Sequence, residues 1–238
     1  MKRPLLRYTL GPVKPLGLTI LRESIKKIQE LYPEFEIIIC HNQLNHKQLN
    51  FIKKLKVELY EQKHEGLTYK PTVENWKMYP PRLDMDRHEM AMDNDIVLMN
   101  KLDEIDRFLK SDNSTLTTED TSRNLGKYSK FLKLRMGLNC GIYGMPPNFN
   151  FAEKIEEMCK QDIVKKWIRR YDDQGLITSA MFNHENCIII PLLKMWILDP
   201  FAEFPKVPPD NYYGAHFVFA NRSRYHRAWH EYMNRKIE

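Results

Sequence analysis

The 238-residue sequence lacks the short patterns that mark several common classes of enzyme. It has no G-x-G-x-x-G and no G-x-x-x-x-G-K-[ST], so dinucleotide-dependent oxidoreductases and P-loop nucleotidases lack their first requirement. It has no G-x-S-x-G, so the nucleophile elbow of α/β hydrolases is also absent. No two cysteines have C-x-x-C spacing, which argues against a zinc knuckle or a redox pair.

Long apolar segments are missing as well. No stretch approaches the length of a transmembrane helix, and the amino terminus has no apolar region of signal-peptide type. We therefore expect no membrane span and a cytoplasmic location. The scattered cysteines are expected to be free, mostly buried thiols, which suits a reducing compartment. They are Cys40, Cys140, Cys159 and Cys187.

The formal net charge is +6, with a pI of about 9.0. A basic surface of this kind is one property of nucleic-acid-binding proteins. The positive charges are dispersed, however, without an RGG run or a basic helix. We therefore expect an anionic small ligand and no nucleic-acid partner.

Segments with strand-like and helix-like patterns alternate along the chain, which predicts an α/β fold. Continuous apolar runs such as residues 35–40 indicate strands buried on both faces, as in a parallel sheet. The expected strands are Leu5–Leu10, Phe35–Cys40, Val57–Tyr60, Met90–Leu98, Leu138–Tyr143 and Cys187–Pro191. The expected helices are Ile20–Leu31, Gln48–Lys56, Leu102–Leu109, Phe151–Lys160, Asp162–Arg169, Gly175–Phe182 and Tyr225–Asn234.

Two carboxylates interrupt the apolar run Met90–Leu98, at Asp93 and Asp95. A buried carboxylate is costly unless it is paired, protonated or bound to a metal. In a continuous strand the two side chains would share one face, and their oxygens would suit Mg²⁺ or Mn²⁺. A second possibility is that Asp93 holds a ribose while Asp95 holds the metal. A third is a turn at a strand end, where Asp and Asn are common.

This segment resembles the D-x-D motif of GT-A glycosyltransferases, and other segments match that family in the same order. The lead-in resembles its nucleotide-holding region, and later segments resemble its N-[SA]-G strand, its D-[DE]-Q helix start and its late metal-binding His. In that order, the four segments are Asn75–Leu83 with His88-Glu89, Leu138–Gly144, Asp172–Leu176 and Gly214–Phe217. The resemblance covers essentially the whole chain and extends to glycosyltransferases encoded by large algal viruses.

The resemblance implies a single GT-A domain over residues 1–238, with a mixed, mainly parallel sheet flanked by helices. Residues 1–100 would form the nucleotide-binding half, and residues 101–238 would complete the metal site and receive the acceptor. The implied activity is metal-dependent transfer of a hexose or similar sugar from a nucleotide-diphosphate donor, UDP-sugar first, to a glycan or glycoprotein. A viral source would place it in the host cytoplasm. A non-catalytic module that binds sugar nucleotides or glycans is the alternative.

The resemblance also implies roles for individual residues. The metal, Mn²⁺ or Mg²⁺, would be held by Asp93, Asp95 and His216. The catalytic group near the donor sugar would be Asn139, Asp172 and Asp173. The nucleotide and donor would contact Thr9, Trp76, Lys77, Arg82, Asp93, Asn94, Gly141, Gln174 and Arg222.

The sequence departs from the family at two places. Cys140 stands where Ser or Ala is usual, and the Lys-Pro-Trp ending of many retaining members is absent. Arg222 or Arg224 is a candidate to replace that lysine against diphosphate, because guanidinium forks suit phosphate oxygens. The late His-Phe pair and the 139–141 strand still favour retention of the anomeric configuration.

Structural alternatives remain for several of these residues. His216 could be a satisfied core histidine, and Trp76 could simply pack in the core. Asp172 and Asp173 could cap a helix. His226 and His230 have the i, i+4 spacing of zinc ligands, but the Glu of H-E-x-x-H is absent, so we expect a solvated terminal helix.

Overall fold

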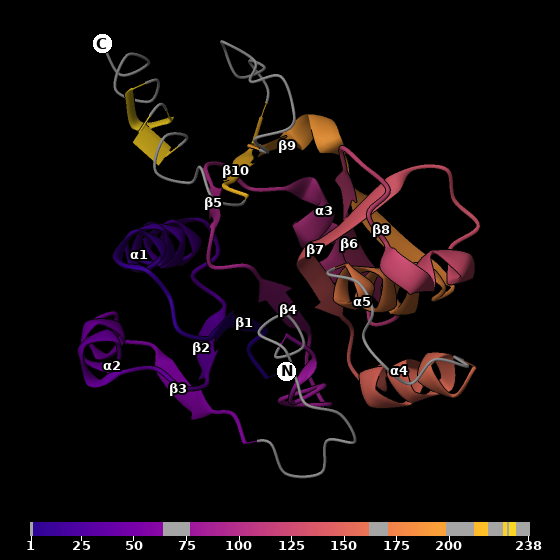
Figure 1. The fold of residues 1–238 in the computed structure, drawn as a ribbon, viewed down its shortest axis with the longest axis horizontal. Coiled ribbons are helices and arrows are strands. Elements are labelled where there is room, and N and C mark those ends of the chain that lie inside the picture. Colours follow the sequence, from indigo (N-terminus) through magenta and orange to yellow (C-terminus); the bar gives the residue numbers. More distant parts are fainter. Residues whose placement is uncertain are drawn as a thin grey trace.

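The computed structural model describes residues 2–63, 77–161, 171–198, 212–218, 226–227 and 229–231. Helices and strands alternate along most of these segments, as the sequence predicts (Figure 1). The strands are β1 (Leu5–Leu10), β2 (Glu36–His41), β3 (Glu58–Glu61), β4 (Glu89–Met92), β5 (Ile96–Leu98), β6 (Ser114–Asp120), β7 (Gly137–Met145), β8 (Asn186–Ile190), β9 (Met195–Ile197) and β10 (Gly214–His216). The α-helices are α1 (Pro15–Leu31), α2 (His46–Lys53), α3 (Asp103–Leu109), α4 (Phe151–Lys160) and α5 (Asp172–Phe182).

The described strands form two sheets. The larger has seven strands in the order β3-β2-β1-β4-β7-β6-β8, and only β7 runs antiparallel to its neighbours. The smaller has the order β5-β10-β9. The chain moves outward from β1 to β3 and then returns to the other side of β1 with β4. Ligands of open α/β sheets bind at such a reversal of strand order, beyond the carboxyl ends of the strands.

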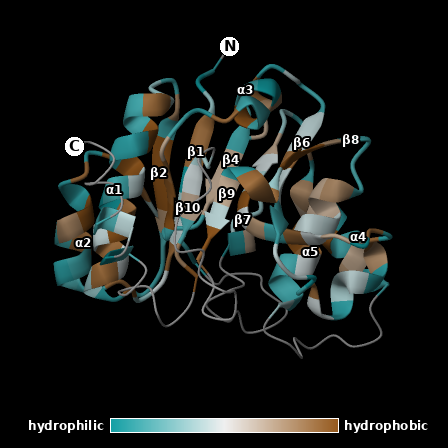
Figure 2. Cartoon of the chain, turned by 90° about the horizontal axis from the view of Figure 1, so that it is seen from above, coloured by the Kyte–Doolittle hydropathy of each residue, from teal (hydrophilic) through white to brown (hydrophobic). Residues whose placement is uncertain are grey.

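Helices cover both faces of the large sheet (Figure 2). One core cluster joins α1, α2 and α3 to one face, through residues such as Ile25, Ile52 and Phe108. A second cluster joins α4 and α5 to the opposite face, through residues such as Ile155 and Leu176. This three-layer arrangement confirms the predicted fold class, a mixed, mainly parallel sheet flanked by helices.

Several predicted elements are confirmed, with shifted ends in some cases. The strand Leu5–Leu10 and the helix Phe151–Lys160 have the predicted bounds. Helix α1 begins at Pro15, five residues before the predicted start at Ile20. Proline suits the first helical position, whereas the prediction began only where the helical spacing of apolar residues became visible. The predicted helix over residues 162–169 lies outside the described residues, and the predicted terminal helix is described only in part.

The prediction of one continuous strand over Met90–Leu98 is wrong. The chain turns at residues 93–95, and the two halves enter different sheets as β4 and β5. The turn-forming preference of Asp and Asn outweighs the apolar pattern on both sides. Asp93 and Asp95 are therefore positioned by a turn between two sheets and not by the alternation of one strand.

A buried charge network joins β1 to β4 at the amino end of β4. Arg7 is 1% exposed, and its Nη1 lies 3.1 Å from Oε1 of the fully buried Glu89. The second arginine of the network, Arg82, has its Nε 3.3 Å from Oε2 of Glu89. Loss of one member of such a network leaves a buried charge unpaired, which costs about 3–5 kcal/mol. The network also fixes the segment that begins at Lys77.

Two further features concern the chain as a whole. The described residues contain no helix that is both long and apolar enough to cross a membrane. Cys40 and Cys140 are buried, and Cys159 and Cys187 are partly exposed.

Candidate metal and nucleotide site

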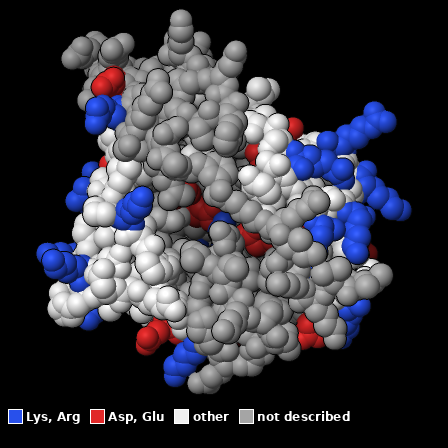
Figure 3. All heavy atoms as spheres, in the orientation of Figure 1, with Lys and Arg blue, Asp and Glu red and all other residues white. Residues whose placement is uncertain are grey.

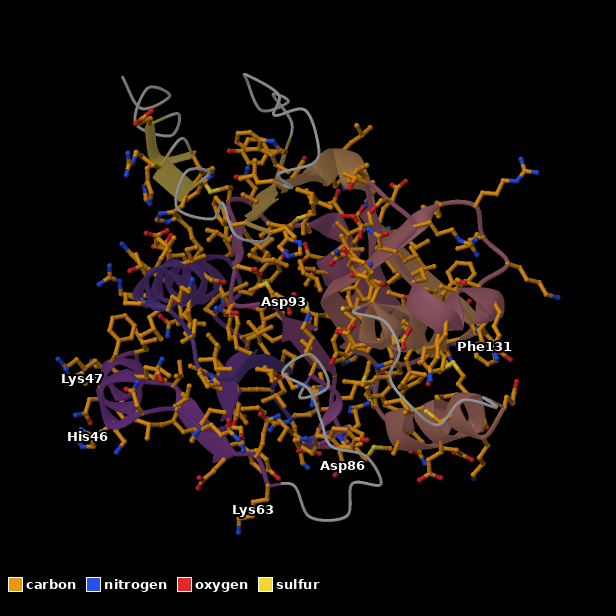
Figure 4. The ribbon with its side chains drawn as sticks, viewed as in Figure 1. His46, Lys47, Lys63, Asp86, Asp93 and Phe131 are labelled. Carbon is orange, nitrogen blue, oxygen red and sulfur yellow. The ribbon has the colours of Figure 1, made fainter. Side chains whose placement is uncertain are left out.

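The candidate site lies where strand order reverses, at the carboxyl ends of β1 and β4. Tyr8 of β1 pairs with Met92 of β4, so Thr9 and Asp93 follow on neighbouring strands at the same edge. Thr9 is partly buried. Asp93 lies near the centre of the molecule (Figure 4), and acidic and basic atoms are visible in a hollow at the centre of the same face (Figure 3). The predicted donor-binding residues Thr9 and Asp93 are thus brought together.

Asp93, Asp95 and His216 converge from two segments of the chain, the turn between β4 and β5 and the end of β10. Each offers one ligand atom, and these atoms all lie within 4.8 Å of one another. Nε2 of His216 lies 3.4 Å from Oδ1 of Asp95. The antiparallel pairing of β10 with β5 creates this approach, because His216 pairs with Ile96, the residue next to Asp95. The backbone N–H of Phe217 also donates to the Asp95 carbonyl at 2.9 Å.

The donor set suits a hard divalent cation. Two carboxylates and one imidazole provide oxygen and nitrogen ligands of the kind that Mn²⁺ accepts, and carboxylates are the usual protein ligands of Mg²⁺. Asp95 and His216 are 4% and 6% exposed, so neither carries its polar group in bulk water. The ring nitrogen of His216 faces the buried Asp95 carboxylate, a contact that suits a metal ligand and also suits the alternative of a satisfied core histidine.

Gly141 makes room for the His216 ring. A Cβ at this position would lie 2.9 Å from Cε1 of His216 and 2.6 Å from Oδ1 of Asn139. Its carbonyl accepts a hydrogen bond from the Asp93 N–H at 2.8 Å, and its own N–H donates to Oδ1 of Asn139 at 2.6 Å. The N-C-G segment therefore supports the turn at residues 93–95 by close backbone approach, which explains why position 141 has no side chain.

Lys77 is the cation nearest to this group among the described residues. Its Nζ lies 2.7 Å from Oδ1 and 2.8 Å from Oδ2 of Asp93, and both side chains are 23% exposed. It also lies 3.7 Å from Sγ of Cys140. Burial lowers the pKa of the Lys77 ammonium, but the charge of Asp93, with a smaller contribution from Asp173, outweighs it and holds that pKa well above its ordinary value. Lys77 therefore stays protonated.

Arg7 and Tyr143 hold Lys77 in place. Nη2 of Arg7 donates to the Lys77 carbonyl at 2.9 Å, and the Tyr143 hydroxyl donates to the same oxygen at 2.8 Å. Sequence patterns did not identify either residue as part of the site. Arg7 is recognisable in the sequence, because it is a charged residue inside the apolar strand β1. Asp93 and Asp95 are charged residues inside an apolar run in the same way.

The titration of the ligand group reflects its burial and its negative charge. Burial raises the pKa of Asp93 above its ordinary value, against the opposing charge of Lys77. Burial lowers the pKa of His216, but the neighbouring Asp95 carboxylate outweighs it, and the pKa lies above its ordinary value.

Asn139 and Gln174 meet at a residue that the sequence did not single out, Asp120. Nδ2 of Asn139 lies 3.2 Å and Nε2 of Gln174 lies 3.3 Å from Oδ2 of Asp120. Gln174 also donates to the Asn124 carbonyl at 2.9 Å. Asp120 ends β6 and thus links β7 to the start of α5. Only its place at the end of a strand could have marked it beforehand.

Asp172 and Asp173 begin α5 and have different surroundings. Asp172 is fully buried, and its Oδ1 accepts a hydrogen bond from the Lys127 N–H at 2.9 Å. Asp173 is 6% exposed, and its charge raises the pKa values of Lys77 and Cys140. Asp173 therefore belongs to the electrostatic surroundings of Lys77, whereas Asp172 joins α5 to the loop at residue 127.

The structure does not bring Arg82 to this group. Its Nη1 donates to the carbonyls of Pro146 and Phe149, and its Nη2 donates to those of Asp84 and Arg87. Its Nε faces Glu89, so all five N–H groups are engaged at the amino end of β4. The expectation that Arg82 shares the charge of a diphosphate is corrected accordingly.

Three other predicted residues complete the comparison. Nδ2 of Asn94 is buried and has no hydrogen-bond partner in the part of the chain that the structure describes. It points toward the amino end of α1, where a Cβ on Gly17 would lie 3.5 Å from it. Trp76 and Arg222 lie outside the described residues.

Solved structures of similar fold are glycosyltransferases. The galactosyltransferase LgtC, in complex with donor and acceptor sugar analogs, has a TM-score of 0.61 and 9% identity, with 95% of each chain covered. The apo structure of the bifunctional glycosyltransferase WbbM has a TM-score of 0.62 and 11% identity, covering 92% of this chain and 46% of WbbM. The glycosyltransferase GlyE of Streptococcus pneumoniae TIGR4 has a TM-score of 0.56 and 11% identity, covering 98% of this chain and 60% of GlyE.

No protein-family model and no curated protein matches this sequence. At these identities the likeness to solved structures establishes the fold, which is of the GT-A type seen in these glycosyltransferases. The alignment with LgtC covers 95% of each chain, so the shared fold extends over nearly the whole of this chain.

Proposed function

We propose that this protein is a metal-dependent glycosyltransferase that uses a nucleotide-diphosphate sugar, with a UDP-sugar as the first candidate. The observation that carries the proposal is the convergence of Asp93, Asp95 and His216 at the strand-order reversal of a GT-A-type fold. The acceptor is a glycan or glycoprotein. The expected viral source, the host-cytoplasmic location and the division at residue 100 remain predictions.

The proposed division of labour follows the contacts around the turn. Asp95 and His216 hold Mn²⁺ or Mg²⁺, and Asp93 holds either the ion or the ribose. The ion supplies Lewis acidity where negative charge develops on the departing diphosphate. Lys77 supplies a fixed positive charge beside Asp93. Such preorganised charge favours the transition state over the bound substrate. Thr9 and Asn94 border the place where the nucleotide would bind.

The donor sugar is proposed to lie against the ends of β6, β7 and α5. Asn139 and Gln174, both held by Asp120, present polar groups toward it, and Asp173 provides negative charge. Glycosyl transfer passes through an oxocarbenium-like state, which a nearby carboxylate stabilises. We propose retention of configuration. Proton NMR of the product from an α-linked donor tests this, and a β-linked product would instead favour Asp173 as the base that an inverting enzyme requires.

Two measurements on the same samples test the function. Thermal shift with UDP, with and without Mn²⁺, reports binding to the native state. A panel of sugar nucleotides then reports turnover, through donor hydrolysis and through transfer. The proposal expects a UDP-dependent shift that grows with Mn²⁺, and turnover of at least one donor.

Asp95→Asn should remove the Mn²⁺-dependent part of the shift and most turnover. Asp112→Asn, on an exposed aspartate, is the matched control and should behave as the wild type. A metal-dependent shift without turnover of any donor would instead favour the non-catalytic sugar-nucleotide-binding module. Absence of any nucleotide-dependent shift would refute both functions.

A further inference from the structure

A second group of three polar side chains lies between α1 and the carboxyl-terminal part of the chain. They are Glu23 of α1 and the pair His226 and His230. Nε2 of His226 lies 2.9 Å from Oε2 of Glu23, and Nε2 of His230 lies 3.2 Å from Oε1. The two Nε2 atoms lie 3.2 Å apart. Because the histidines are four residues apart in a helical segment, they share one face and can approach Glu23 together.

No arrangement of ring hydrogens satisfies all three of these contacts. Each Nε2 carries either one hydrogen or one lone pair. If both carry hydrogens, both can donate to Glu23, but the two N–H groups then oppose each other across 3.2 Å. If only one carries a hydrogen, the other ring presents a lone pair to the carboxylate. A cation at the centre of the three atoms would remove the conflict, because it accepts two nitrogen lone pairs and one carboxylate oxygen.

The spacing of the three atoms fits a four-coordinate ion. Ligands at about 2.0–2.1 Å from a tetrahedral Zn²⁺ lie about 3.3 Å from one another. The two Nε2 atoms lie 3.2 Å apart, and each lies 2.9 or 3.2 Å from a different oxygen of Glu23, so one carboxylate oxygen can serve as the third ligand after a small adjustment. All three atoms lie within 4.8 Å of one another, as do those of the Asp93 group.

We propose that Glu23, His226 and His230 form a second metal site, for a zinc-like transition ion, distinct from the Asp93–Asp95–His216 group. Two imidazoles and one carboxylate are a frequent set of protein ligands for Zn²⁺ and leave a fourth position open. The Asp93 group has two carboxylates and one imidazole and is better suited to Mn²⁺ or Mg²⁺. The side chain of His230 is 45% exposed, so an ion from solution can reach the site.

An ion at the second metal site would hold the carboxyl-terminal segment beside the Asp93–Asp95–His216 group. The ring of His226 lies 5.5 Å from the ring of Phe217, and that of Trp229 lies 5.7 Å from it. Phe217 directly follows His216 and donates its N–H to Asp95. An ion bound by Glu23 and the two histidines would therefore join α1 to the segment that packs over Phe217. The expectation of a solvated helix is wrong for His226, which is 8% exposed.

The test uses the full chain without a polyhistidine tag. Co²⁺, which replaces Zn²⁺ and absorbs visible light in four-coordinate sites, is titrated into the Asp95→Asn variant so that the first site is silent. We expect one equivalent to bind with visible absorption, and Zn²⁺ to displace it. His230→Gln and Glu23→Gln should each weaken binding about tenfold or more. His46→Gln, on an exposed histidine of α2, is the matched control and should leave it unchanged.

Wild-type protein provides a second measurement if Asp95→Asn does not fold. It should bind two equivalents of Co²⁺, and His230→Gln should reduce this to one. Zn²⁺ should also raise the melting temperature of the wild type and do so less in His230→Gln. The proposal is overturned if His230→Gln binds as many equivalents of Co²⁺ as the wild type, or if His230→Gln and Glu23→Gln bind as tightly as the His46→Gln control. Either result leaves the proposed glycosyl transfer untouched, because that function rests on Asp95 and His216.

Discussion

Replacing Lys77 by methionine should tighten Mn²⁺ binding and at the same time slow turnover. In the structure the ammonium occupies the face of Asp93 that a metal would share, with Nζ–O distances of 2.7 and 2.8 Å. Methionine keeps the length of the side chain and removes its charge. The main-chain position of residue 77 is held separately, by Arg7 and Tyr143 on its carbonyl, so the segment should stay in place.

The size of the effect follows from Coulomb's law. For a divalent and a monovalent cation about 5 Å apart, the repulsion is about 2 kcal/mol with water-like screening and about 7 kcal/mol at an effective dielectric constant of 20. Both side chains are 23% exposed, which favours the lower value. Mn²⁺ affinity should therefore rise by about tenfold to thirtyfold. Turnover should fall, because the developing charge on the diphosphate loses a fixed partner.

Calorimetric Mn²⁺ titration and steady-state kinetics measure the two effects, with the melting temperature as a check on folding. Lys194→Met is the matched control, since Lys194 is also 23% exposed and its Nζ lies 2.8 Å from Oε1 of Glu104. Weaker Mn²⁺ binding in Lys77→Met, or the same tightening in Lys194→Met, would refute the competition between Lys77 and the metal for Asp93.

Three further substitutions test other parts of the site. Gly141→Ala should weaken Mn²⁺ binding in calorimetry and lower stability by about 1–3 kcal/mol, because its Cβ would collide with the His216 ring; unchanged affinity would mean that the ring position is unimportant. Asp173→Asn should lower kcat about 10²-fold or more with little change in nucleotide affinity, and an unchanged kcat would reduce Asp173 to a favourable negative charge in the first turn of α5. Arg82→Lys should lower stability in urea by about 2 kcal/mol while UDP affinity stays constant, and a selective loss of UDP affinity would return Arg82 to the phosphates.

The grouping of Asp93, Asp95 and His216 is what the resemblance to GT-A glycosyltransferases implies, and the side chains do converge in the structure. The resemblance to GT-A glycosyltransferases supplied the order of the segments, and the pairing of β10 with β5 brings the last ligand to the first two. The sequence offered a turn at residues 93–95 only as one alternative, because the apolar residues on both sides suit one long strand as well as two short ones.

The sequence does not reveal which residues contact main-chain carbonyls or distant helices, although Arg7 is recognisable as a charge inside an apolar strand. Arg7 and Tyr143 reach the carbonyl of Lys77, and a carbonyl has no sequence signature. Glu23 lies more than 200 positions from His226, so spacing relates it to nothing nearby. The prediction that Arg82 contacts the donor is wrong because the order of the motifs does not show at which end of β4 a preceding residue lies. In the structure Arg82 lies at the amino end, beside Glu89.

Anomalous diffraction at the manganese edge, from crystals grown with Mn²⁺ and UDP, addresses the metal site most directly. We expect a manganese peak within bonding distance of Asp95 and His216, with the diphosphate of UDP bound to the same ion. The nucleoside should lie along the carboxyl ends of β1 and β4, near Thr9. UDP bound elsewhere, or UDP at this edge with no manganese between Asp95 and His216, would contradict the proposed metal-dependent transfer.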